Sequence, residues 1–335
     1  MPTKYYVLDI SKLEVGDILL TSVGAIPSVG IRKLIKSDYS HAMLYVGGGS
    51  YIHSDLTGVH ADNLQRLLLD SPCRATVLRV ERLNRSSIVS EVVTYARRKV
   101  GTQYSKREAA GVIVKKLRSD LKNRQFCSRL VALAFAEAAF PLVADANYCT
   151  PQDIFESSVL IEVPECVREA SPSEVEFANS FNPLEVQRRG TNQFLEDVRK
   201  ISGLDIQMHE QVAQCVVDHP EYDAAISEAL QRSGYLDFWR LDVSINPWRY
   251  SSESFLNLDI PTDKVVESAR YEVGSAKEAI KRFSFCHSQY HELNGRFPRR
   301  YFQLEHELYT LLVELHTKRM ESAQLVIRTL EGKGL

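Results

Sequence analysis

Hydrophobic and polar residues alternate over short runs in the first half of the chain, a pattern typical of half-buried β-strands. These runs predict strands at residues 15–20, 41–46, 51–53, 59–61, 75–80 and 158–163. Elsewhere in this half, apolar residues recur every three or four positions, as they do along one face of a helix. That spacing predicts helices at residues 26–36, 63–69, 88–100, 106–117 and 127–139. We therefore expect an α+β fold in which helices pack on one side of a small antiparallel sheet.

The second half of the chain carries helical spacing almost throughout. This spacing predicts helices at residues 192–201, 209–218, 221–232, 264–293 and 300–330, with an irregular segment at 239–262. The two longest helices flank a turn at residues 294–298, which predicts an antiparallel helical hairpin. Leucines at heptad spacing in the last helix predict a buried seam formed by Leu304, Leu308, Leu311, Leu315 and Leu325.

Proline and serine interrupt both patterns between the two halves, at Pro164 and at Ser171-Pro172-Ser173. The chain of 335 residues is also longer than one typical domain. We expect an α+β domain at residues 1–168 and a mostly helical domain at residues 185–335. The leucine seam of the helical domain is first of all a core, and a surface for a protein partner or for self-association is its second interpretation.

Composition excludes some classes of function. The formal net charge is −2, which gives no global electrostatic case for binding nucleic acid. No apolar stretch reaches the ~18 residues that a membrane span needs. The first ten residues do not read as a secretion signal, so we expect a cytoplasmic protein, with delivery by a dedicated secretion route as the alternative. Six cysteines without a CxxC motif indicate a reduced compartment and no disulfide framework.

One cysteine stands in a distinctive position. Cys127 opens the predicted helix at residues 127–139, where free backbone N–H groups favour negative charge. A thiol is a strong nucleophile only as thiolate, and a helix N-terminus or a nearby imidazole lowers its pKa. The same N–H groups can hold an oxyanion. Cys127 is therefore a candidate nucleophile, and a small residue facing the core is the alternative interpretation.

Histidines on the predicted strands are candidates for the base. His41 begins the strand at residues 41–46, from which an imidazole can project over the edge of the sheet. His53 ends the next strand and is a candidate for the third group, which orients the base. His60 is an alternative for that third role. Each of them is also typical of a structural histidine, and the sequence leaves the choice between His53 and His60 open.

Several short motifs follow one another in the first half of the chain. They are Gly16-Asp17-Ile18, Ser40-His41-Ala42, Gly101-Thr102-Gln103-Tyr104, Cys127-Ser128-Arg129-Leu130-Val131 and Thr150-Pro151-Gln152-Asp153-Ile154. The series resembles the permuted papain-like hydrolases of the YiiX/YaeF type, which are distant relatives of the NlpC-type cell-wall peptidases. In this branch the histidine strand precedes the cysteine helix, and this chain has the same order.

The resemblance implies a permuted papain-like fold and thiol-dependent hydrolysis of an amide, peptide or ester bond. It implies that Cys127 is the nucleophile, that His41 is the general base and that the polar residue on the following strand, here His53, is the orienter. That third residue is often Glu in the YiiX branch, so His53 departs from the pattern. The resemblance also implies that Tyr104 lies near the substrate pocket. It implies no metal and no organic cofactor.

Other functions fit parts of the sequence. Relatives of lecithin–retinol acyltransferase share this fold and use the same Cys–His pair on lipids, so a lipid acyltransferase or a thioesterase-like enzyme is an alternative. A catalytically inactive fold that serves as a binding module is another. A metal site at Cys286, His287 and His291 is a further interpretation, because two imidazoles four residues apart share a helix face. Ser288, however, stands where a zinc protease motif has Glu.

Overall fold

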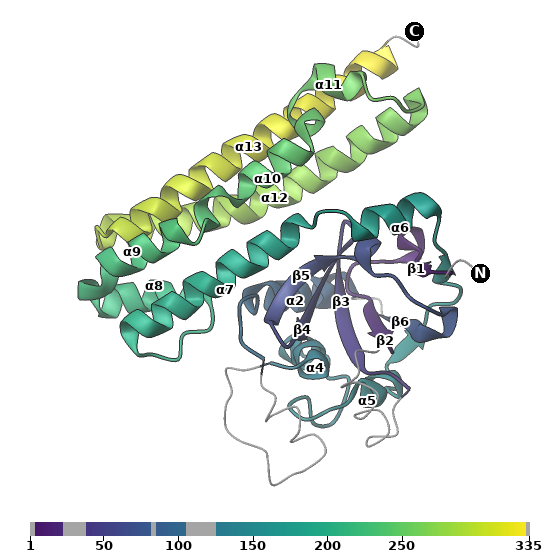
Figure 1. Ribbon diagram of the computed structural model, residues 1–335, viewed down its shortest axis with the longest axis horizontal. Coiled ribbons are helices and arrows are strands. Elements are labelled where there is room, and N and C mark those ends of the chain that lie inside the picture. Colours follow the sequence, from purple (N-terminus) through teal and green to yellow (C-terminus); the bar gives the residue numbers. More distant parts are fainter. Residues whose placement is uncertain (1–3, 23–37, 82–84, 105–124, 333–335) are drawn as a thin grey trace. The chain divides into compact units, whose positions relative to one another are not determined.

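The computed structural model of the protein describes residues 4–22, 38–81, 85–104 and 125–332 (Figure 1). The predicted helices at residues 26–36 and 106–117 lie outside this described part. The chain divides into two compact units, residues 1–188 and residues 189–335. The first unit therefore includes the whole segment at residues 164–173 where the sequence pattern changes.

A six-stranded antiparallel sheet forms the centre of the first unit (Figure 1). Its order is β5 (Gly58–Asn63), β4 (Ser50–Asp55), β3 (His41–Gly47), β2 (Ile18–Thr21), β6 (Ala75–Val80) and β7 (Leu160–Glu162). All six strands lie where alternation of apolar and polar residues predicts them. A separate two-stranded ribbon pairs β1 (Tyr6–Leu8) with β8 (Val167–Glu169), and the sequence pattern does not predict it.

Both faces of the sheet are buried, each by a different layer. Ile18, Leu20 and Leu44 belong to one hydrophobic cluster, which they share with the helices α2 (Arg85–Arg98) and α4 (Cys127–Glu137). Leu19 and Met43, on the opposite face, pack in a second cluster. This second cluster includes Leu8, Leu13, Leu64 and Cys166, from the β1–β8 side of the unit. The expected α+β arrangement with helices on one side of an antiparallel sheet is therefore confirmed, and a ribbon and short turns cover the other side.

The Gly16-Asp17 motif has a structural role at the beginning of β2. Gly16 has a φ of +91°, and a Cβ at this position would lie 2.5 Å from a methyl carbon of Val89 on α2. The Asp17 carboxylate is fully buried and accepts hydrogen bonds from Arg79 Nε at 2.8 Å and from Arg85 at 3.2 Å. Because a buried carboxylate is stable only when it is paired, these contacts fix the position of β2 against α2.

Helices dominate the rest of the chain. The remaining α-helices are α5 (Pro151–Phe155), α6 (Pro172–Asn179), α7 (Pro183–Ser202), α8 (His209–Asp218), α9 (Asp223–Arg232), α10 (Phe238–Ile245), α11 (Ser252–Leu256), α12 (Thr262–Arg296) and α13 (Arg300–Glu331). Single 3₁₀ turns lie at Ile10–Lys12, Leu64–Arg66, Pro72–Arg74, Pro220–Tyr222, Tyr235–Asp237 and Pro247–Tyr250. The predicted helix at residues 63–69 is thus reduced to one turn. The helical second unit is confirmed, with α12 and α13 as its long hairpin.

Two expectations for the second unit are wrong. Residues 239–262 are not irregular, because α10 and α11 form there. Ser251 caps α11 by accepting a hydrogen bond from the Ser254 amide. Leu325 is 44% exposed and lies outside the predicted seam. In this part of α13 the buried residues are Ala323 and Val326 instead.

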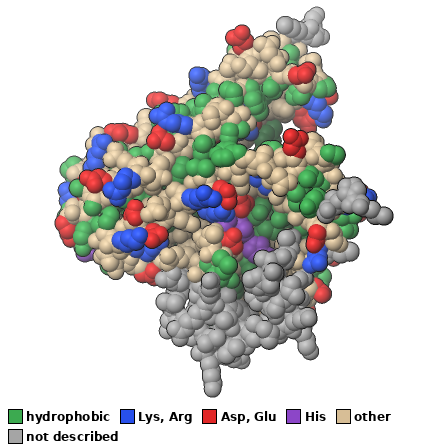
Figure 2. All heavy atoms as spheres, viewed as in Figure 1, with side chains coloured by type: hydrophobic (Ala, Val, Ile, Leu, Met, Phe, Trp, Pro, Cys, Tyr) green, Lys and Arg blue, Asp and Glu red, His purple; other side chains and the backbone are tan. Residues whose placement is uncertain are grey.

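The helices and one face of the surface bear on membrane and charge properties of the described residues. None of the described helices combines the length and the apolar content that crossing a bilayer requires. On the face shown in Figure 2, acidic and basic side chains of the described residues are interspersed, and neither sign forms a continuous field. This mixture agrees with the net charge of −2.

Candidate active site

Helix α4 presents Cys127 as its first residue. The N-cap is Phe126, which supplies no side-chain hydrogen bond, so the first backbone N–H groups are not capped by a side chain. Two neighbours of Cys127 hold this end of the helix in place. Ser128 Oγ donates to the Cys149 carbonyl at 2.7 Å, and Arg129 donates to Asn147 Oδ1 at 3.1 Å. The Cys-Ser-Arg part of the motif therefore positions the helix start that carries the thiol.

The Cys127 thiol is a free, partly exposed group next to strand β3. Burial raises its pKa, while the backbone N–H groups of Ala42, Ser128 and Cys127 itself act in the opposite direction. Desolvation is the largest of these effects, so it outweighs the helix N-terminus, one of the two features that the sequence analysis expected to lower this pKa. The contact with the Ala42 amide places the sulfur beside the peptide that directly follows His41.

His41 and His53 form the central hydrogen bond of the site. Strands β3 and β4 pair with Met43 opposite His53, so His41, two residues before Met43, lies diagonally across from His53 on the same face. The distance from His41 Nε2 to His53 Nδ1 is 2.7 Å. Burial, reinforced by the neighbouring His53, lowers the pKa of His41 to about 3. His41 is therefore neutral at physiological pH and can accept a proton.

Asp62 continues this chain of contacts on β5, and the sequence analysis missed it. The Oδ2 atom of Asp62 lies 3.3 Å from His53 Nε2. Burial acts to raise the pKa of Asp62, but its contacts with His53 and His60 hold that pKa well below the ordinary value. The sequence did hold a signal for Asp62. Residues 58, 60 and 62 alternate along the predicted strand, so Asp62 lies on the same face of the sheet as His60.

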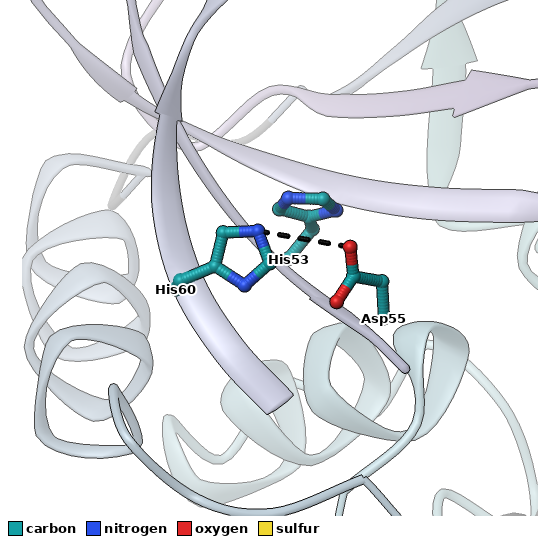
Figure 3. Close-up of side chains that lie close together, drawn as sticks. All are labelled: His53, Asp55 and His60. Atoms are coloured by element: carbon teal, nitrogen blue, oxygen red, sulfur yellow. Dashed lines mark ion pairs between the residues drawn. The ribbon is translucent and has the colours of Figure 1, made fainter. Parts of the chain in front are cut away.

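His60 lies directly opposite His53 in the pairing of β4 and β5, and it is buried. Its Nδ1 is 3.1 Å from the Gly58 carbonyl, and its Nε2 is 3.1 Å from Arg188 Nη1. Figure 3 shows its ring beside His53 and Asp55, with its Nε2 3.8 Å from Asp55 Oδ2. Of the two histidines that the sequence left as candidates for the third role, His53 is the one hydrogen-bonded to His41.

Tyr104 lies beside the start of α4. It forms a parallel bridge with Gln125, two residues before Cys127. Burial raises the pKa of Tyr104 above its usual value, and the nearby Cys127 and Asp55 add to this effect. A neutral phenol that can donate a hydrogen bond is thus close to the candidate nucleophile.

The alternative metal site on the last helices has a different geometry from the one the sequence indicated. His306 of α13 approaches His287 of α12, with 3.1 Å between their Nε2 atoms, and His291 lies on the same face. Among the described residues, the group whose ligand atoms all lie within 4.8 Å of one another is instead His53, Asp55 and His60.

Comparison with known proteins agrees with this architecture. Residues 12–173 match the model of a family described as permuted papain-like amidase enzymes, YaeF/YiiX, C92 family. The match covers the N-terminal half of the chain, as the motifs predicted, and the resemblance is confirmed. A comparison with curated proteins found no match.

Proposed function

We propose that this chain, whose N-terminal half matches the permuted papain-like amidase family, hydrolyses an amide or peptide bond through Cys127, His41, His53 and Asp62. The observation that carries the proposal is the 2.7 Å hydrogen bond between His41 and His53, next to a cysteine at an uncapped helix start. A nucleophile, a base and an orienting group in hydrogen-bond sequence are the arrangement that thiol hydrolases require.

The hydrogen bonds that join Asp62, His53 and His41 support catalysis when each donor and acceptor is assigned in one particular direction. The Asp62 carboxylate accepts from His53 Nε2–H, and His53 Nδ1 accepts from His41 Nε2–H. His41 then keeps a lone pair on Nδ1, the nitrogen that remains to take the thiol proton. When His41 becomes an imidazolium, the negative charge of Asp62 stabilises it through His53.

The pKa directions favour general-base catalysis over a preformed ion pair. Burial raises the pKa of Cys127 and lowers the pKa of His41, so both groups are neutral in the resting enzyme. His41 takes the proton as the sulfur attacks the carbonyl carbon, and a tetrahedral oxyanion forms. The backbone N–H groups at the start of α4 hold that oxyanion, an interaction typically worth about 3 kcal/mol of barrier per donor.

The second half of the reaction follows from the same groups. The imidazolium of His41 gives its proton to the leaving nitrogen, and an acyl-thioester on Cys127 remains. Water attacks this thioester after giving a proton to His41, and the carboxylic acid product leaves the restored thiol. Tyr104, near both Cys127 and Asp55, is the side chain that we assign to contact with the substrate.

The test is a screen of amide and peptide substrates with the full chain and the Cys127→Ser variant. We expect hydrolysis by the wild type and its loss in the variant, while the melting temperature stays within a few degrees. Cys149→Ser serves as the control for cysteine removal, since Cys149 is buried behind α4. Activity that persists in Cys127→Ser would overturn the proposal.

A further inference from the structure

His53 and Asp55 on β4 and His60 on β5 form a compact group of ligand atoms, which includes the proposed orienting residue His53. Each residue offers one nitrogen or oxygen, and these atoms all lie within 4.8 Å of one another (Figure 3). Both histidines are buried, whereas the Asp55 side chain is 38% exposed, so the group is open to solvent on the Asp55 side. We infer that this group binds a divalent transition-metal cation such as Zn²⁺, and that the bound cation inhibits the Cys127–His41 pair.

The hydrogen bonds of His60 leave a lone pair aimed into the group. The Gly58 carbonyl can only accept, so the proton of His60 is on Nδ1, 3.1 Å away. Arg188 can only donate, at 3.1 Å from Nε2, so Nε2 carries the lone pair. An Nδ1–H bond to a backbone carbonyl is how proteins usually orient a histidine that binds metal through Nε2.

That lone pair faces two carboxylates. His60 Nε2 lies 3.3 Å from Asp62 Oδ2 and 3.8 Å from Asp55 Oδ2. A cation placed between these atoms is coordinated by the imidazole nitrogen and the carboxylate oxygens together. The Arg188 guanidinium supplies one positive charge at present. Arg188 also contacts Glu185 at 3.2 Å, which gives it a partner when a metal ion displaces it.

The spacing suits a small tetrahedral ion. Ligands about 2.0–2.1 Å from Zn²⁺ lie about 3.3 Å from one another at tetrahedral angles. His53 Nε2 and His60 Nε2 are each 3.3 Å from Asp62 Oδ2, and His60 Nε2 is 3.8 Å from Asp55 Oδ2, so small shifts bring these atoms to that spacing. Imidazole and carboxylate ligands together are a donor set that zinc accepts.

Inhibition follows from the protons on the two imidazoles, and this step rests on the proposed function. A metal ion on His53 Nε2 excludes the proton from that nitrogen, so the proton moves to Nδ1. His53 Nδ1 then donates to His41 Nε2, across the 2.7 Å hydrogen bond. The proton of His41 must in turn be on Nδ1, the nitrogen that takes the thiol proton in the proposed mechanism, and Nδ1 can then no longer accept. No proton is gained or lost, but the hydrogen-bond direction is reversed.

Direct binding is tested first, by calorimetric titration of Zn²⁺ into the full chain. All proteins carry His287→Gln and His306→Gln, to remove the histidine pair on α12 and α13 as a competing site. We expect one Zn²⁺ per chain, binding that survives Cys127→Ser, and affinity that falls about tenfold or more in His60→Gln. Arg188→Gln is expected to raise the affinity, because it removes the competing cation. Unchanged affinity in His60→Gln, or loss of binding in Cys127→Ser, would overturn the site.

Cobalt and iodoacetamide then test the location and the effect of the metal. Co²⁺ bound here should show d–d absorption without a thiolate charge-transfer band, since no sulfur is a ligand. Zn²⁺ should slow iodoacetamide labelling of Cys127 in the parent protein and leave the labelling rate of His60→Gln unchanged relative to the same variant without metal. Binding without any slowing would disprove inhibition but keep the site. Absence of hydrolysis under all conditions would overturn the proposed function, and the calorimetry would still decide the site.

Discussion

Both units of this protein bury charged and polar side chains, but they use them differently. In the second unit, Glu272 of α12 and Arg319 of α13 are hydrogen-bonded to each other and almost fully buried. In the first unit, the buried His53 links Asp62 to His41, and Ala42, the residue after His41, contacts the nucleophile candidate through its amide. A buried pair whose charges neutralise each other stabilises one packing arrangement. A buried chain of hydrogen-bonded groups, here Asp62, His53 and His41, can instead accept a proton from the nucleophile.

The comparison teaches that burial of polar groups is not itself a sign of catalysis. Asp17 makes the same point within the first unit. Its carboxylate is fully buried, and two arginines satisfy it by hydrogen bonds. The functional distinction is whether the last group of the series can change its protonation state toward a substrate.

The largest effect is expected when the base is removed. His41→Ala should lower kcat/KM by about 10³- to 10⁴-fold, because the thiol then has no acceptor for its proton. Its melting temperature should change little, since His41 is partly exposed at the end of a strand. Steady-state kinetics and thermal unfolding measure the two quantities. A large loss of stability with an unchanged rate would mean that His41 has a structural role, like the buried ion pair of the second unit.

The matching change in the second unit should affect stability and leave the chemistry alone. Glu272→Met leaves Arg319 buried without its carboxylate and is expected to cost about 3–5 kcal/mol in the free energy of unfolding. Denaturant unfolding measures this loss. The double variant Glu272→Met with Arg319→Met should regain most of it, because Arg249, which also contacts Glu272 at 3.3 Å, keeps Asp242 as a partner at 2.8 Å. If the double variant is as unstable as the single one, the ion pair is not the cause.

A smaller effect on rate is expected at the far end of the histidine series. Asp62→Asn should lower kcat/KM by about 10- to 100-fold, less than the loss of His41, because Asp62 acts through the intervening imidazole of His53. A positioning role predicts that the loss falls on kcat rather than on KM. The exposed Asp70 provides the control, and Asp70→Asn should match the wild type. If Asp62→Asn has the same kcat/KM as the wild type, Asp62 has no part in catalysis and only His41 and His53 remain as candidates beside Cys127.

The smallest effect concerns the pH at which cysteines react. Burial raises the pKa of both Cys127 and Cys286, so each thiolate appears only at higher pH than in a free cysteine, whose pKa is about 8.5. Iodoacetamide labelling followed by mass spectrometry should place both midpoints above that value. Loss of His41 should slow the labelling of Cys127 near neutral pH and leave Cys286 unaffected. A midpoint for Cys127 well below 8.5 would indicate a preformed ion pair instead.

The amino-acid sequence by itself determined the strands of the central sheet, the long helices and the fold class of this protein, but not the β1–β8 ribbon, α10 or α11. Alternation of apolar and polar residues is set by the period of a strand, so the positions of the strands in the central sheet could be read directly. The start of α4 was equally local, because the apolar spacing of residues 130, 131, 134 and 135 begins directly after Cys127. The motif series around Cys127 and His41 was local too, and it predicted the family whose model matches residues 12–173.

Only the tertiary structure decided which groups meet. The register of β3, β4 and β5 brings His53 between His41 and Asp62, and a shift of one residue would turn His53 to the other face of the sheet. Register depends on pairing between strands, which no local pattern encodes. The same holds for the raised pKa of Cys127, because the sequence shows the helix N-terminus but not how much water the folded chain excludes from the sulfur.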